Sequence, residues 1–488
     1  MTRHSRFAVP LGFLLLAGCV TPPDLGPKPI PRTPESVAAT RSLAPAPGAA
    51  WPGDRWWTDY GDAQLSALIE EALQGAPDVA AAAARLQRAR GLTQQAGAAT
   101  LPTLDAQGRA GYDRQSLNLG FPDTFKPFLP HGWQESAQVA GTLAFDLDLW
   151  GKNRAALAAA TSEERAAALD LAQARTTLAT GIASSYADLA RLYDERDVRL
   201  AALEVRNASR KLVGDRQING LETRGSLRQA DAEAATARAA LGETEQAIAV
   251  RQHQIAALMG AGPDRGLAIA RPALPAARLA GVPEGTTTAL IARRPDIVAA
   301  RERVEAAARR IRVARADFFP SIRLSALVGV QAFGFDNLIA KDSLYGSAGP
   351  AIDLPIFDAG ARRGRYRGAR ADYDLAVAAY DQAVVTAYQD AADAVTGVTM
   401  IAQRLADARA AVAASQDAYT IAQGRYRAGL SNYLDVLAVE DRLLAARLAA
   451  ASLEAAARSA DIALIRALGG GFAGISQDTH TDKDQSHG

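Results

Sequence analysis

The feature that most constrains this chain is an internal duplication. Three glycines of the first half recur at identical intervals of 69 and 40 residues in the second half: Gly151, Gly220 and Gly260 match Gly360, Gly429 and Gly469. The stretch from 77 to 102 also matches the stretch from 295 to 320 without a gap. Such self-similarity indicates a repeated structural unit. The nine-residue difference in length falls between Pro102 and Gly151, which are 49 residues apart against 40 in the second half.

The segments that differ in length between the two halves show the alternation of apolar and polar residues that is typical of β-strands. Apolar or small residues alternate with polar ones in four runs of roughly ten residues, near 103–113, 137–149, 321–331 and 344–356. A period of two with polar residues on one face is typical of a strand between lipid and water. We therefore expect Leu143 and Phe145 to face lipid, and Gln138 and Asp146 to face an aqueous lumen.

Four strands are too few to close a sheet on itself, because even a small barrel needs about eight. We therefore predict that the four strands of each chain contribute to a transmembrane β-barrel of twelve strands, shared by three chains. The segments Asn118–His131 and Phe333–Lys341 are expected to be external loops, the first one longer. The alternative is an ordinary soluble β-sandwich, which would show the same alternation.

The rest of each half is predicted to be helical. Residues 152–219 and 361–428 contain no proline, and helices of this length span about 100 Å. After each turn a returning segment carries an apolar residue at every seventh position: Leu227, Ala234, Leu241, Ile248 and Ile255, then Val436, Leu443, Ala450, Ala457 and Leu464. A strict seven-residue repeat indicates a left-handed coiled coil. The predicted fold class is mixed α+β and mostly α, with coiled-coil hairpins forming an α-barrel that continues the β-barrel.

The first residues resemble a secretory signal. Arg3 and Arg6 precede an apolar run that is too short to span a membrane as a helix. The small residues Ala17 and Gly18 then precede Cys19, the only cysteine of the chain, so we predict cleavage before Cys19 and its acylation. Several acyl chains on one residue make a stable anchor. The alternative is an incidental thiol inside an ordinary cleavable signal.

Composition and spacing argue against several other classes of function. The net charge of +1 gives no electrostatic case for binding nucleic acid, whose binding proteins show concentrated basic patches. The histidines are scattered without metal-ligand spacing: His4, His131, His253, His480 and His487. Gly469, Gly471 and Gly474 spell a GxGxxG, but a long predicted helix precedes them instead of a strand. We therefore predict no enzyme activity, no metal, no cofactor and no nucleic-acid partner.

At this point the residues resemble a known family. The matching motifs, in chain order, are Trp56-Trp57, Gly61-Asp62 with Leu65, Leu68-Ile69, Pro77-Asp78, Arg293-Arg294-Pro295-Asp296, Phe318-Phe319-Pro320-Ser321-Ile322, Pro355-Ile356-Phe357-Asp358, Arg425-Tyr426 with Gly429, and Ala467-Leu468-Gly469-Gly470-Gly471-Phe472. The chain resembles the TolC-like outer membrane factors, and in particular the NodT-type outer-membrane lipoproteins of resistance-nodulation-division (RND) efflux systems. The resemblance extends over nearly the whole chain after the signal.

The resemblance implies a homotrimer in the outer membrane, lipid-anchored and with a long periplasmic extension. It implies passive export of drugs or other small toxic compounds, received from an inner-membrane RND pump through a periplasmic adaptor protein. Two alternatives remain: the exit duct of a protein or peptide secretion system of type I, and a purely structural coiled-coil lipoprotein. The four alternating runs argue against the second alternative.

The two predicted hairpin turns are the expected site of contact with the adaptor. This docking surface comprises Gly220 and Leu221 of the first turn and Gly429, Leu430 and Ser431 of the second. Polar residues around the second turn are candidates for a periplasmic gate: Arg425, Asn432, Tyr433 and Asp435. We expect Asp435 to pair with Arg425 or with an arginine of a neighbouring hairpin such as Arg216.

The predicted organisation follows from these points. It comprises a signal peptide (1–18), a lipidated Pro-rich tether (19–50), a first repeat (51–260) with strands at about 103–150 and a helical hairpin at about 152–260, a second repeat (261–474) with strands at about 321–357 and a hairpin at about 361–468, and a disordered tail (475–488).

Overall fold

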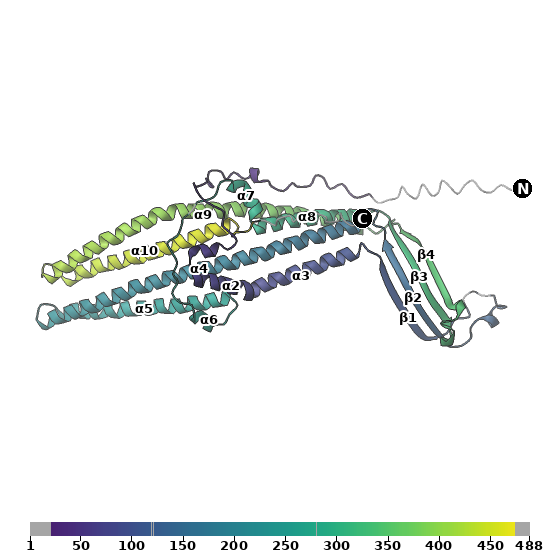
Figure 1. Ribbon diagram of the computed structural model, residues 1–488, viewed down its shortest axis with the longest axis horizontal. Coiled ribbons are helices and arrows are strands. Elements are labelled where there is room, and N and C mark those ends of the chain that lie inside the picture. Colours follow the sequence, from purple (N-terminus) through teal and green to yellow (C-terminus); the bar gives the residue numbers. More distant parts are fainter. Residues whose placement is uncertain (1–20, 119, 121, 280, 474–488) are drawn as a thin grey trace, which may run out of the picture. The chain divides into compact units, whose positions relative to one another are not determined.

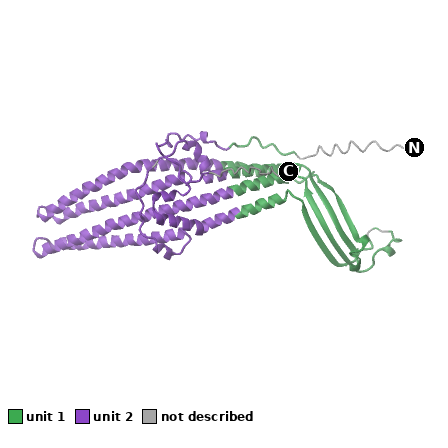
Figure 2. Ribbon diagram, viewed as in Figure 1, with its two compact units in different colours: residues 1–30, 87–165, 301–378 green, residues 31–86, 166–300, 379–488 purple. Residues whose placement is uncertain are grey.

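The computed structural model describes residues 21–118, 120, 122–279 and 281–473 (Figure 1). The predicted signal peptide, Cys19 and the tail from 475 to 488 lie outside the described residues. The chain divides into two compact units (Figure 2). The first comprises residues 1–30, 87–165 and 301–378, and the second comprises residues 31–86, 166–300 and 379–488.

Helices dominate the described chain, as the sequence predicts. They are α2 (Ala63–Gly75), α3 (Pro77–Ala98), α4 (Lys152–Ile218), α5 (Arg224–Leu258), α6 (Pro263–Leu267), α7 (Thr286–Arg293), α8 (Pro295–Ala316), α9 (Ala361–Arg427) and α10 (Tyr433–Ala467). Helices α4 and α9 have 67 residues each, and α5 and α10 have 35 each. The duplication is therefore preserved residue for residue in the helical hairpins. Within the described residues, no helix combines the length and the apolar character that crossing a membrane requires.

The seven-residue stripes lie against neighbouring helices. In α5, Ala234, Ile248 and Ile255 are buried, and in α10 the corresponding positions Leu443 and Leu464 are buried. The alanines of these stripes allow close approach of the helix axes, because a methyl side chain keeps the backbones near each other. The predicted coiled-coil character of the hairpins is confirmed.

The first unit contains one antiparallel sheet with the strand order β1-β2-β3-β4. Its strands are β1 (Thr103–Asp113), β2 (Gln134–Asp146), β3 (Ser321–Phe333) and β4 (Leu344–Asp353). The four predicted strands are thus confirmed. Between β1 and β2 the chain takes residues 114–133, whereas between β3 and β4 it takes only 334–343. The extra length of the first half therefore lies in this loop.

The register of the sheet gathers residues of like polarity on each face. Leu143 pairs with Leu104 on one side and with Ala326 on the other. Gln138 pairs with Arg109 and with Gln331. Since side chains alternate along a strand, Leu143 shares one face with its apolar partners and Gln138 shares the other with polar ones. One face is therefore apolar, and the other carries most of the polar side chains.

The core of the second unit forms around the start of α2. Trp56, Trp57 and Ile69 are buried there together with Tyr186 of α4. The Asp62 side chain caps α2 by accepting hydrogen bonds from the backbone N–H groups of residues 64 and 65, and it also accepts one from the Tyr186 hydroxyl at 2.9 Å. The Gly61-Asp62 motif thus serves as a helix start whose buried carboxylate is fully partnered.

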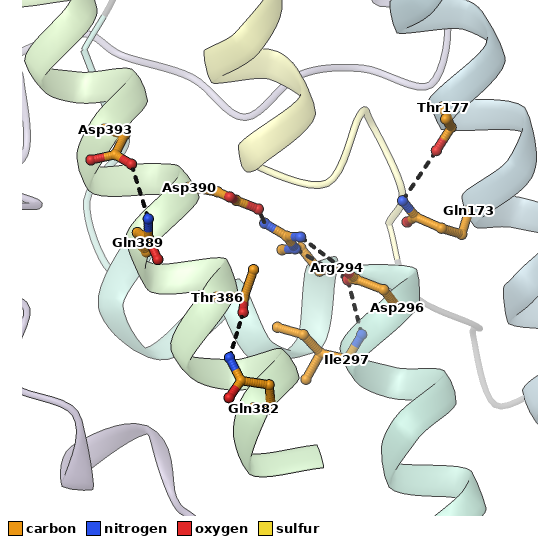
Figure 3. Close-up of polar contacts among 10 residues, drawn as sticks. All are labelled: Gln173, Thr177, Arg294, Asp296, Ile297, Gln382, Thr386, Gln389, Asp390 and Asp393. Atoms are coloured by element: carbon orange, nitrogen blue, oxygen red, sulfur yellow. Dashed lines mark hydrogen bonds and ion pairs between the residues drawn. The ribbon is translucent and has the colours of Figure 1, made fainter. Parts of the chain in front are cut away.

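The beginning of α8 is held by a buried arginine (Figure 3). Arg294 donates to both carboxylate oxygens of Asp296, at 3.1 and 2.7 Å, and to Asp390 of α9 at 3.0 Å. Its side chain is 10% exposed, so the two carboxylates balance a charge that is nearly removed from water. The Arg-Arg-Pro-Asp motif is therefore a structural link between helices.

The glycines that follow α10 are needed for close packing. Gly469, Gly470 and Gly471 have φ of +97°, +61° and +86°, values that side-chain-bearing residues rarely adopt. A Cβ atom on Gly469 would lie 2.1 Å from the carbonyl oxygen of Arg293. The GxGxxG spelling therefore arises from packing at a helix end and not from a dinucleotide site.

Candidate functional site

The two hairpin turns have the same backbone design. In the first turn Gly220 has φ +73°, and the Leu221 N–H donates to the Arg216 carbonyl at 2.8 Å. In the second turn Gly429 has φ +75°, and the Leu430 N–H donates to the Arg425 carbonyl at 2.9 Å. A left-handed glycine with these bonds closes a helix C-terminus, because it satisfies carbonyls that the helix leaves unpaired.

Exposed leucines stand at both turns. Leu221 is 66% exposed and Leu430 is 70% exposed. Ser431 is half-buried, and Asn432 after it is the N-cap residue of α10. These are the residues that the sequence predicts for contact with the adaptor, and the structure places them at the turns.

The two turns are joined within one chain through Tyr426 of α9. The Tyr426 hydroxyl donates to the carboxylate of Glu222, in the first turn, at 2.9 Å. The Arg216 guanidinium of α4 lies over the Tyr426 ring at 4.8 Å from its centroid. Burial and the bond to Glu222 both raise the pKa of Tyr426, so the hydroxyl stays protonated and remains a donor. Sequence reasoning named Tyr426 only as part of a family motif and missed Glu222.

Within the chain, Asp435 forms helix-capping hydrogen bonds in place of the predicted ion pair. Asp435 accepts from the backbone N–H of Asn432 at 3.3 Å, and the Asn432 side chain accepts from the Asp435 N–H at 2.9 Å. This reciprocal capping box fixes the start of α10. In the part of the chain that the structure describes, no ion pair joins Asp435 to Arg425 or Arg216, because capping and the stacking on Tyr426 occupy these groups. A pair between neighbouring chains stays a prediction.

Of the other gate candidates, Tyr433 is buried and Arg425 is exposed. The Tyr433 ring lies 6.1 Å from that of Tyr426 and packs with Val213 of α4 and Val436 of α10. Residues of both hairpins thus share one apolar cluster just above the turns. The structure therefore brings Asn432, Tyr433 and Asp435 together at the start of α10, while Arg425 points into solvent.

A buried group of charges lies further along the hairpins. Arg206 of α4 reaches Glu440 at 3.0 Å and Asp441 at 2.5 Å on α10, and lies 3.9 Å from Glu233 of α5. Arg206 and Glu440 are only 4% and 5% exposed. Three carboxylates surround one guanidinium, but the side chains of Asp441 and Glu233 are 59% and 27% exposed, so only Glu440 is removed from water together with Arg206.

This environment changes the acidity of the buried groups. Burial raises the pKa of Glu440 to about 7, and the attraction of Arg206 opposes this rise only in part. Burial also raises the pKa of the nearby Tyr433 and Tyr419 hydroxyls. Sequence reasoning missed this cluster, although one signal was present. Glu440 stands four residues after Val436 and three before Leu443, on the predicted apolar face of its helix.

The sheet supplies the remaining predicted site residues. Leu143 is 43% exposed on the apolar face. On the opposite face, Gln138 donates to the Tyr345 hydroxyl of β4, and Asp146 pairs in register with Arg323 of β3. The predicted division of Leu143 and Phe145 from Gln138 and Asp146 thus holds for the faces of the sheet. Which face meets lipid stays a prediction. Among the described residues, no group of acidic, histidine or cysteine side chains has the arrangement of a metal site.

Solved structures with this architecture are outer-membrane channels. The chain matches the outer membrane protein VceC of Vibrio cholerae with a TM-score of 0.81 and 42% identity, over 86% of this chain and 100% of that one. It matches the outer-membrane channel OprN with a TM-score of 0.80 and 29% identity, over 93% of this chain and 99% of that one.

Sequence relatives point in the same direction. The fusaric acid resistance protein FusA of Burkholderia cepacia is 34% identical over 366 residues, which are 73% of this chain and 68% of that protein. The pyoverdine export outer membrane protein OpmQ of Pseudomonas putida is 31% identical over 468 residues, 95% of this chain and 97% of that protein. The model of the outer membrane efflux protein family matches residues 68–261 and 287–470, one segment in each repeat. This chain, with its duplicated hairpins and four-stranded sheet, belongs to the outer membrane efflux proteins, a family of channels and not of enzymes.

Proposed function

We propose that this chain is one third of a passive export duct in the outer membrane, which receives small toxic compounds from an inner-membrane pump through a periplasmic adaptor. The observation that carries the proposal is the sheet, with one apolar face, one largely polar face and two unpaired edges at β1 and β4. An open edge is unfavourable in a lipid environment, because its N–H and C=O groups have no partner there.

Pairing between chains removes these edges. Strand order and antiparallel pairing make β1 and β4 run in opposite directions, so β4 of one chain can pair antiparallel with β1 of the next. Three copies then close twelve strands into one barrel with a polar interior. The family membership supports a trimer of this kind, since solved relatives are outer-membrane channels.

The substrate class is inferred from the relatives. Two of them are named for fusaric acid resistance and for pyoverdine export, and others for multidrug resistance. Small organic molecules are therefore the expected cargo of this chain. The adaptor would contact the exposed leucines at the turns, Leu221 and Leu430, together with Gly220, Gly429 and Ser431.

We also infer a lipid anchor at Cys19 and a gate at the hairpin turns. The gate would comprise Arg425, Asn432, Tyr433 and Asp435, held inward in the resting trimer. Exposed ion pairs between chains contribute only ~0–1 kcal/mol each, but several of them around a ring can bias a two-state closure. Replacing Asp435 and Arg425 together by alanine should raise single-channel conductance in planar bilayers, and an unchanged conductance would place the gate elsewhere.

A transport experiment tests the main proposal. The chain is expressed together with an RND-type pump and its periplasmic adaptor, in a Gram-negative host that lacks its own efflux channels. The expected result is lower accumulation of ethidium, with no effect when the pump is omitted. The proposal fails if accumulation is unchanged and the purified protein forms no pores in planar bilayers.

A further inference from the structure

A groove rich in arginine lies where α4 begins and α8 ends, within the first unit. It has a volume of about 500 Å³. Four arginines and two aromatic residues line it, and alanine and glycine make up the remaining lining: Arg154, Arg309, Arg312, Arg315, Trp150 and Phe319. The lining contains no carboxylate. Arg309, Arg312 and Arg315 are three residues apart, so they project from one side of α8.

Two of these arginines have no acidic partner. Arg154 bonds to Asp148 at 3.2 Å, and Arg309 lies 3.9 Å from Glu305. Arg312 and Arg315 are exposed and form no ion pair with any carboxylate in the described ranges. Like charges one helical turn apart repel each other. The groove is therefore arranged to attract an anion.

A second hollow, which shares Trp150 and Phe319 with this groove, has a different design. There Asp317 pairs with Lys152 at 2.7 Å and with Arg365 at 3.6 Å. The same hollow includes Asp146 and Asp353, which end the strands. Its lining combines four carboxylates with three cationic side chains, whereas the lining of the groove has four arginines and no carboxylate. The excess of positive charge is therefore confined to the groove and does not extend to the neighbouring hollow at the ends of the strands.

Aromatic residues mark the depth at which the groove would lie in a membrane. The Trp150 ring stacks on Phe319 at 4.8 Å, and its Nε1–H donates to the Pro320 carbonyl at 2.7 Å. Trp150 follows the end of β2 by four residues, and Phe319 precedes β3 by two. Tryptophan is enriched at the boundary between hydrocarbon and water. The groove therefore begins where the apolar face of the sheet ends, at the level of lipid headgroups.

We propose that this groove binds the phosphate of an anionic glycerophospholipid from the periplasmic leaflet of the outer membrane. Arginine suits this ligand, because its planar fork of N–H donors matches phosphate oxygens. Arg312 and Arg315 hold the phosphate, Trp150 and Phe319 contact the glycerol region, and the acyl chains follow the apolar face of the sheet. The proposal rests on the outer-membrane position given under Proposed function.

The test uses the full-length channel purified in a neutral detergent. Binding of dioleoylphosphatidylglycerol and of dioleoylphosphatidylcholine is measured by native mass spectrometry, for the wild type and for the Arg312→Gln/Arg315→Gln variant. Each arginine near an anionic lipid contributes about a fivefold gain in affinity, so the double variant should bind phosphatidylglycerol roughly 25-fold more weakly. Binding of phosphatidylcholine should be weak in both proteins.

A matched control removes two arginines outside the groove. The Arg363→Gln/Arg367→Gln variant loses the same charge from exposed positions of α9, and it should bind phosphatidylglycerol as the wild type does. Equal losses in both variants would show diffuse attraction to surface charge and would overturn the site. Displacement of the lipid by excess inorganic phosphate would overturn the choice of a lipid as ligand.

Conductance separates this proposal from the proposed function. All variants should form pores of wild-type conductance in bilayers of phosphatidylcholine. Loss of selective lipid binding with normal pores would support the groove. If the wild type forms no pores but still binds phosphatidylglycerol selectively, the proposed duct is wrong and the lipid site stands.

Discussion

The buried carboxylate of Glu440 should make the stability of the hairpins depend on pH. Its pKa of about 7, against 4.5 for an ordinary glutamate, means that the folded chain binds this proton more tightly than the unfolded chain does. The stabilisation is fully present below pH 4.5 and is lost as the pH rises through about 7. With 1.36 kcal/mol for each pKa unit, the loss approaches about 3 kcal/mol.

The Glu440→Gln variant keeps the size of the side chain and removes its titration. Arg206 retains Asp441 and Glu233 as partners in this variant. We expect the wild-type melting temperature, measured in detergent, to fall between pH 5 and pH 8 relative to that of the variant. At pH 8 the variant should be the more stable protein.

Comparing the wild type with the Glu440→Gln variant separates the titration of Glu440 from that of other groups that titrate between pH 5 and pH 8. Glu454 lies on the same helix with a 37% exposed side chain that pairs with Arg409. Glu454→Gln removes an equivalent charge and should follow the wild-type profile. Parallel profiles for the wild type and Glu440→Gln over the whole range would refute the reasoning.

Further predictions concern the anchor, the sheet, the turns and the glycine loop. Cys19→Ser should abolish incorporation of labelled palmitate while the protein stays in outer-membrane fractions; a soluble periplasmic product would contradict the membrane-inserted sheet. Arginine at Leu143, if it lies near the bilayer midplane, should cost ~2–4 kcal/mol and lower the yield of folded channel, whereas arginine at Gln138 should be tolerated. Tyr426→Phe removes the bond to the Glu222 carboxylate, worth ~1.5–3 kcal/mol as a bond to a charged group, and should raise single-channel conductance; no change would argue against a gate at the turns. Gly469→Ala should destabilise the protein by more than ~1 kcal/mol, seen as a lower melting temperature, because its Cβ would meet the Arg293 carbonyl.

The sequence allowed the fold to be predicted because its signals are periodic and duplicated. The recurrence of glycines at equal intervals located both hairpin turns, and the structure has Gly220 and Gly429 there with positive φ. The seven-residue stripes and the alternating runs each report one local geometry, since a helix and a strand repeat with different periods. Both patterns arise between residues that are close together in the sequence, so they can be recognised in the sequence of one chain.

The site was harder to predict because its contacts join residues that are far apart in sequence. Tyr426 and Glu222 are 204 residues apart, and Arg206 and Asp441 are 235 apart. No local pattern says which polar residue of one hairpin meets which residue of the other. The expectation for Asp435 failed within the chain for a related reason: a short polar side chain at a helix start has a nearby backbone N–H as an alternative partner.

The duplication itself explains why the turns can carry a specific contact. Both turns close with the same backbone bonds, so the two hairpins end in the same way. At equivalent positions, however, the first half has Gln217 where the second has Tyr426, and Ser226 where the second has Asp435. At these positions the second hairpin therefore offers the buried Tyr426 hydroxyl, and the first offers Glu222, where the second has Ser431, to accept from it. Because the two hairpins have equal lengths, their turns lie at corresponding positions. Because their side chains differ, the hydrogen bond has its donor on the second hairpin and its acceptor on the first. Two hairpins with identical side chains could not form this asymmetric contact.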